Sequence, residues 1–81
     1  MAEALDPRGQ ARPRFHSVAT TAAILGMSEV TLYRAIHAGQ FPAVKVRGRF
    51  VIPARALDDM EASALSTGLV DAGDYALRQA S

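Results

Sequence analysis

The sequence contains no cysteine and no long apolar run. The missing thiols exclude disulfide scaffolds and thiolate metal sites. The two histidines, His16 and His37, lie far apart without neighbouring metal ligands, so we expect no metal site and no other cofactor. No apolar stretch approaches the roughly 18 residues of a membrane span, and the first residues lack the apolar core of a signal peptide. We therefore expect a soluble cytoplasmic protein that does not act on membranes.

Length and residue content also argue against catalysis. A chain of 81 residues forms one small domain with tails, and a core of this size rarely contributes more than about 3–5 kcal/mol. That leaves little stability for a deep, dry substrate pocket. The sequence has no Ser/His/Asp arrangement and no glycine-rich phosphate loop, and Ser17 and Ser28 are explained as helix caps. We predict that the protein is not an enzyme.

The charges are distributed unevenly along the chain. The net charge is +1, but residues 7–57 carry eight basic side chains against one acidic side chain, whereas residues 58–81 carry five acidic side chains against one arginine. A basic middle and an acidic end fit a nucleic-acid face on one side of a domain. Charges scattered over a solvated surface would give the same composition.

Two short helices joined by a tight turn are predicted after a flexible basic arm. Residues 1–14 hold two Pro, one Gly and three Arg without an apolar period, which is typical of a flexible arm. Ser17 is a good N-cap for a first helix that ends at Gly26. Ser28 is an N-cap for a second helix that ends near Gly39. This spacing predicts a helix-turn-helix unit.

A β-hairpin and a third helix follow. After Pro42 the apolar period changes from 3.6 to 2, and two short strands flank Arg47-Gly48, a two-residue turn with glycine where a positive φ is needed. Pro53 opens a helix that runs from residue 54 to about residue 65, and its core candidates are Leu57, Met60 and Leu65.

The resulting prediction is a mostly α domain with a small β-hairpin, in the winged helix-turn-helix layout, over residues 15–65. Residues 66–81 form an acidic, weakly ordered C-terminal tail with at most one helical turn, near residues 75–78.

Individual residues, and not only the order of the elements, are similar to those of a known family. Over about residues 15–62 the sequence resembles the small MerR-like excisionases, also called recombination directionality factors. The likeness is carried by Ser17-Val18-Ala19, Ala22-Ala23-Ile24-Leu25-Gly26-Met27-Ser28, Thr31-Leu32-Tyr33-Arg34, Gly39-Gln40-Phe41-Pro42-Ala43-Val44-Lys45-Val46, Gly48-Arg49-Phe50, Ile52-Pro53 and Ala56-Leu57. Arg47 departs from the family pattern, in which a second Gly is frequent before Gly48. This departure stiffens the turn and adds a charge at its tip.

The resemblance implies that the helix after Ser28 is a recognition helix and that the hairpin is a wing. The candidate DNA-binding residues of the recognition helix are Ser28, Glu29, Thr31, Leu32, Tyr33 and Arg34. Those of the wing are Lys45, Arg47, Gly48 and Arg49, and Arg55 is a further candidate for a phosphate contact.

Several of these residues have more than one possible role. Arg34 can grip a guanine edge, contact a phosphate or pair with Glu29. Glu29 can accept from cytosine or simply complement the helix dipole. Tyr33 is either a phosphate contact or half core, Thr31 either binds DNA or points to solvent, and Leu32 is a core residue or a thymine-methyl contact, with the core preferred.

The resemblance also implies the function. Such excisionases load cooperatively on repeated sites in double-stranded DNA, bend it and direct an integrase toward excision, in a bacterial or phage-infected cell. Neighbouring protomers and the integrase are therefore the expected partners. A small MerR-like transcriptional regulator is the alternative, and an adaptor that has lost DNA binding is a third reading. The short segment after the third helix encodes no obvious two-fold dimer.

Overall fold

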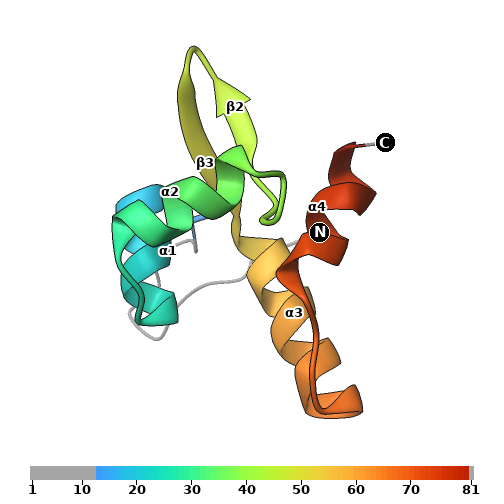
Figure 1. The fold of residues 1–81 in the computed structure, drawn as a ribbon. Coiled ribbons are helices and arrows are strands. Elements are labelled where there is room, and N and C mark those ends of the chain that lie inside the picture. Colours follow the sequence, from blue (N-terminus) through green and yellow to red (C-terminus); the bar gives the residue numbers. More distant parts are fainter. Residues whose placement is uncertain (1–12, 81) are drawn as a thin grey trace, which may run out of the picture.

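Short helices and strands alternate along the chain in the computed structural model, which describes residues 13–80 (Figure 1). Residues 1–12 of the predicted basic arm lie outside the described residues. The elements are β1 (Phe15–Ser17), α1 (Val18–Leu25), α2 (Glu29–His37), β2 (Val44–Val46), β3 (Arg49–Pro53), α3 (Ala54–Thr67) and α4 (Ala72–Ala80). None of the helices among the described residues is long and apolar enough to cross a membrane.

The two helices of the helix-turn-helix begin at the predicted caps. The Ser17 hydroxyl oxygen accepts from the backbone N–H of Thr20 at 3.0 Å, and the Ser28 hydroxyl oxygen accepts from that of Thr31 at 3.1 Å. Gly26 ends α1 with a φ of 72°, a left-handed conformation that glycine adopts without a steric cost. The predicted helix starts and the turn between the helices are therefore confirmed.

The strands form one antiparallel sheet in the order β1-β3-β2. The pair β2–β3 is the predicted hairpin. β1 is an addition that the sequence did not reveal, and it pairs His16 with Ile52. A three-residue strand carries too short a pattern to be recognised before its partner is known.

The apolar sides of the two hairpin strands face in opposite directions. Residues that pair directly share a face of the sheet, and Lys45 pairs with Phe50 while Val44 pairs with Val51. Phe50 and Ile52 therefore lie on the core face. Val44 and Val46 lie on the outer face and remain 38% and 52% exposed.

The core lies where α1, α2 and β3 meet. Its buried residues are Val18, Ala22, Leu32, Ile36, Phe41 and Ile52, and Leu57 and Met60 of α3 pack against them while partly exposed. The prediction that Leu65 belongs to the core is wrong, because its side chain is 83% exposed. Leu65 lies near the end of α3, beyond the reach of the sheet.

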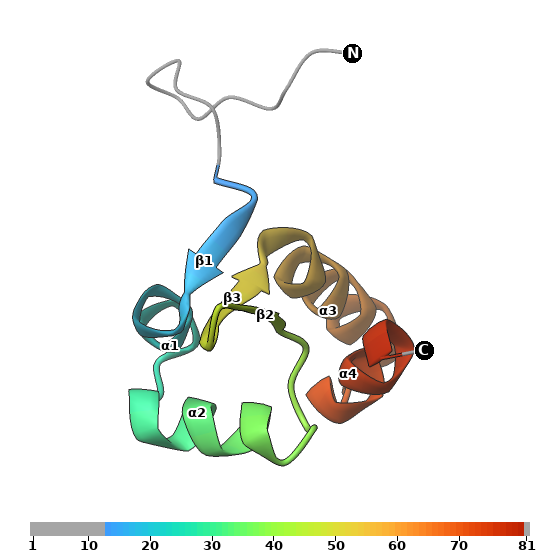
Figure 2. The same ribbon diagram turned by 90° about the horizontal axis from the view of Figure 1, so that it is seen from above.

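The acidic C-terminal segment contains more helix than the sequence predicted. α3 extends to Thr67, and α4 covers Ala72–Ala80, where at most one turn was expected. The Tyr75 hydroxyl donates to the Ser63 hydroxyl oxygen at 2.7 Å, which links α4 to α3. Figure 2 shows α1 and α2 on one side of the strands and α3 and α4 on the other. The fold is the predicted mostly helical, winged helix-turn-helix arrangement.

Candidate nucleic-acid interface

The second helix, α2, presents a polar face to solvent. Glu29, Thr31, Tyr33 and Arg34 are exposed along it. Leu32 is fully buried in the core, so the structure corrects its inclusion among the candidate DNA contacts. Leu32 points inward because α2 buries the side chains at positions 32 and 36, one helical turn apart.

The hydroxyl groups at the start of α2 are not equivalent. The Ser28 hydroxyl accepts from the Thr31 N–H and donates to the Thr31 hydroxyl oxygen at 2.8 Å. Its only hydrogen is therefore used inside the protein. The Thr31 hydroxyl keeps its own hydrogen for an outside acceptor. Phosphate oxygens are acceptors, so Thr31 is the member of this pair that can bind one without breaking a cap.

The hairpin turn projects from the body of the domain (Figure 1). Arg47 and Gly48 both have a positive φ, of 53° and 80°, as a type I′ turn requires. The predicted need for glycine at position 48 is confirmed, and Arg47 shares the left-handed conformation although it has a Cβ.

The three cations of the hairpin point in different directions. Lys45 pairs with Phe50 and so lies on the core face, whereas Arg49 pairs with Val46 on the outer face. Arg47 lies at the tip between them. All three side chains are exposed, so the hairpin presents positive charge on both faces and at its end.

An aromatic cluster joins α2 to the hairpin. The rings of Tyr33 and His37 lie 5.5 Å and 5.2 Å from the ring of Phe50, both edge to face, and Tyr33 and His37 lie 5.0 Å from each other. The Lys45 ammonium lies 5.9 Å from the Phe50 ring centroid, within cation–π range. The cluster therefore fixes how the hairpin stands against the helix.

Sequence reasoning missed the part that His37 and Phe50 play in this cluster. It considered His37 only as a possible metal ligand and gave it no part in the interface. Tyr33 and His37 are one helical turn apart, which is the available signal, but only the fold brings Phe50 to them.

The exposed cations of this surface are available to an outside anion. Within the described part of the chain, no ion pair engages Arg34, Lys45, Arg47 or Arg49, and Arg34 does not pair with Glu29. Arg55 is also exposed, but it lies in the first turn of α3, which packs against β3 and α4. Among residues 13–80, no group of three His, Cys, Asp or Glu side chains is placed to hold a metal ion.

Known proteins share this part of the chain. Residues 17–63 match the family model described as "Helix-turn-helix domain". The chain is also 41% identical over 64 residues to each of two proteins of Mycobacterium tuberculosis. They are named "Putative DNA-binding protein MT0521" (strain CDC 1551 / Oshkosh) and "Putative DNA-binding protein Rv0500A" (strain ATCC 25618 / H37Rv). The match covers 79% of this chain and 77% of each relative. No solved structure matches the chain. The family match spans α1, α2, the hairpin and most of α3, and the chain therefore belongs to the helix-turn-helix domain family.

Proposed function

We propose that the protein binds double-stranded DNA, with α2 in the major groove and the hairpin as a wing on the adjacent minor groove. The observation that carries this proposal is the surface of α2 and the hairpin, which the Tyr33–His37–Phe50 cluster holds together. Its cations have no ion pair among residues 13–80. Membership of the helix-turn-helix family and the names of the two relatives support it.

Four exposed residues of α2 have roles that suit their chemistry. Arg34 reads a guanine edge through two parallel hydrogen bonds. Thr31 donates its free hydroxyl hydrogen to a phosphate or contacts a thymine methyl group. Glu29 complements the positive end of the helix dipole and accepts from cytosine where one is present. Tyr33 supports the wing with its ring and leaves its hydroxyl for a phosphate.

The wing contributes affinity more than base discrimination. Arg47 at the tip enters the minor groove, where narrow A·T tracts favour an arginine. Lys45 and Arg49, on opposite faces of the hairpin, reach phosphates on either side of that groove. Gly48 keeps the turn narrow, because it adds no side chain beside Arg47.

We infer that this DNA binding serves excision by an integrase, as in the excisionases that the sequence resembles. One small domain covers only about 600–1,000 Å² of surface on DNA, so useful affinity requires neighbouring protomers on repeated sites. The protein then acts without catalysis of its own, by bending DNA and contacting the integrase. A small transcriptional regulator would use the same surface.

A salt titration tests DNA binding itself. If about five cations neutralise phosphates, log K should fall with log salt at a slope near −4.5, about −0.9 for each phosphate. Arg34→Ala should cost roughly 1–3 kcal/mol at the selected site if it reads a base. Arg55→Ala tests the further candidate phosphate contact, and a slope less steep by about 0.9 would include Arg55 in the interface. A slope near zero would end the proposal.

Selection of bound fragments from the parent genome, followed by footprinting, tests the biological role. Protection of tandem repeats beside a recombination site supports the excisionase. Protection at a promoter makes the protein a regulator instead. If no fragment is enriched, the domain is an adaptor that does not bind DNA.

A further inference from the structure

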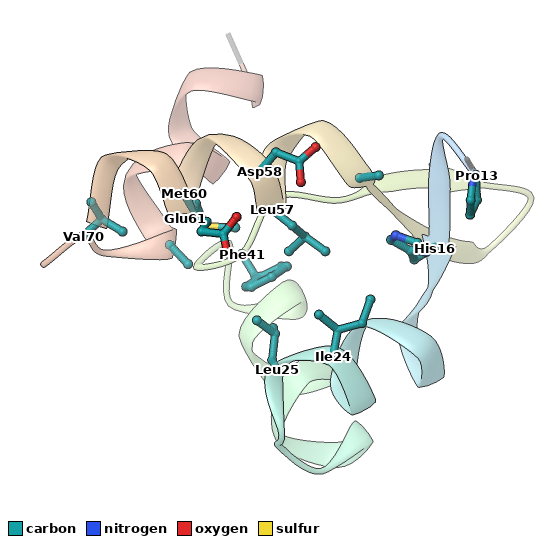
Figure 3. Close-up of a pocket in the computed structure, with 12 residues that line it drawn as sticks. Pro13, His16, Ile24, Leu25, Phe41, Leu57, Asp58, Met60, Glu61 and Val70 are labelled. Atoms are coloured by element: carbon teal, nitrogen blue, oxygen red, sulfur yellow. The ribbon is translucent and has the colours of Figure 1, made fainter. Parts of the chain in front are cut away.

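An apolar groove lies between α1 and α3, away from the surface formed by α2 and the wing. It has a volume of about 610 Å³, within the range of pockets that bind small ligands. Figure 3 shows Ile24 and Leu25 of α1 opposite Leu57 of α3. The lining residues are Pro13, His16, Ile24, Leu25, Phe41, Ala54, Leu57, Asp58, Met60, Glu61, Val70 and Ala72.

The groove leaves apolar side chains in contact with water. Ile24 and Leu25 are 55% and 43% exposed at the end of α1, and Ala56 is the only buried residue of α3. Leu57 and Met60, one turn apart on α3, touch the core yet stay partly exposed. A ligand with apolar side chains would remove this surface from water, and each square ångström buried contributes about 25 cal/mol.

The charge of the groove selects the kind of ligand. Asp58 and Glu61, both exposed on α3, are the acidic residues of its lining, and among residues 13–80 no lysine or arginine lines it. Nucleic acid is repelled by such a surface, whereas a segment that carries cations is attracted.

We propose that this groove binds a short segment of a partner protein that combines apolar side chains with neighbouring lysines or arginines. The apolar side chains fill the space between Ile24, Leu25 and Leu57. The cations pair with the carboxylates of Asp58 and Glu61 at the rim. Because α3 and α4 lie across the strands from α2 (Figure 2), the partner can bind while α2 and the wing hold DNA, and the inference does not depend on the DNA proposal.

The test is a selection of binding peptides from a random-sequence display library on the full chain, followed by affinity measurements with the synthesised peptides. We expect the selected sequences to combine leucine-like residues with lysine or arginine. The double variant Asp58→Asn/Glu61→Gln should weaken their binding roughly tenfold. Each ion pair between a carboxylate and a peptide cation is partly exposed, and its loss lowers the affinity by up to about fivefold. The control Asp59→Asn/Asp74→Asn removes the same charge outside the groove and should leave the affinity unchanged.

A second pair of variants tests the apolar part. Ile24→Ser should weaken peptide binding roughly fivefold, because the peptide then covers less apolar surface at position 24. Leu65→Ser replaces an exposed apolar residue of α3 that does not line the groove, and it should have no effect. All six positions changed in these variants are exposed, so the variants should fold, and thermal unfolding checks this.

Four results would overturn the proposal. If the selected peptides are acidic, or if their affinity is unchanged in the groove variants, they bind to the basic surface of α2 and the hairpin instead. An empty selection would show that the groove binds no such segment. Binding that strengthens severalfold when residues 1–12 are deleted would make the chain's own N-terminal segment the occupant. If the parent protein self-associates in sedimentation and the Asp58→Asn/Glu61→Gln variant does not, the occupant of the groove is a second copy of the chain.

Discussion

Arg47 at the wing tip should lower stability while it raises DNA affinity, and one substitution separates the two effects. Its φ of 53° lies in the left-handed region, which costs a residue with a Cβ about 1–2 kcal/mol. Asparagine adopts this conformation more readily, and Asn-Gly is the preferred pair in a type I′ turn. Arg47→Asn should therefore stabilise the domain by about 0.5–1 kcal/mol, which corresponds to a rise in Tm of roughly 2–8 °C for a domain of this size.

The same substitution removes a cation from the proposed DNA surface. The slope of log K against log salt should become less steep by about 0.9, the value for one phosphate contact. Arg47→Lys is the matched control, because it keeps both the charge and the strained backbone. Its Tm and its salt slope should equal those of the parent.

Calorimetric unfolding and a salt titration of DNA binding check the two halves separately. A Tm of the Arg47→Asn variant equal to or below that of the parent would refute the strain argument. An unchanged salt slope would remove Arg47 from the interface even if the stability rises as expected.

Three further predictions concern the body of the domain. Thr21 is fully buried and its hydroxyl has no hydrogen-bond partner among the described residues, so Thr21→Val should stabilise the fold by about 1–2 kcal/mol in urea unfolding; destabilisation would mean that a partner exists. Ser28→Ala removes the cap of α2 and should cost about 1 kcal/mol, whereas an unchanged Tm would show that the cap is dispensable. Tyr33→Leu and Phe50→Leu, combined in a double-mutant cycle, should show a coupling of about 0.5–1.5 kcal/mol, and strict additivity would contradict the ring contact.

Local chemistry made much of the fold predictable. Ser17 and Ser28 cap helices by bonding to residues three positions on, and Gly26 ends a helix by its own φ. Arg47-Gly48 sets the hairpin turn in the same way. Each of these signals acts within a few residues, so it is readable before any packing is known. The helix-turn-helix followed by a wing therefore came from the sequence, together with the candidate cations.

Contacts between distant segments decided the rest. The alternating pattern of the hairpin shows that each strand has an apolar side, but only the packing of β3 on the core puts Phe50 inside and leaves Val44 and Val46 outside. Leu65 fits the helical pattern and is still exposed, since no element among residues 13–80 covers it.

The surface formed by α2 and the hairpin and the groove likewise exist only in the tertiary structure. The aromatic cluster joins residues from α2 and β3, and the groove joins α1 with α3. By itself the sequence determined which local elements form, because capping and turn chemistry are short-range. The tertiary structure decided which faces are covered, because burial depends on what packs against each face.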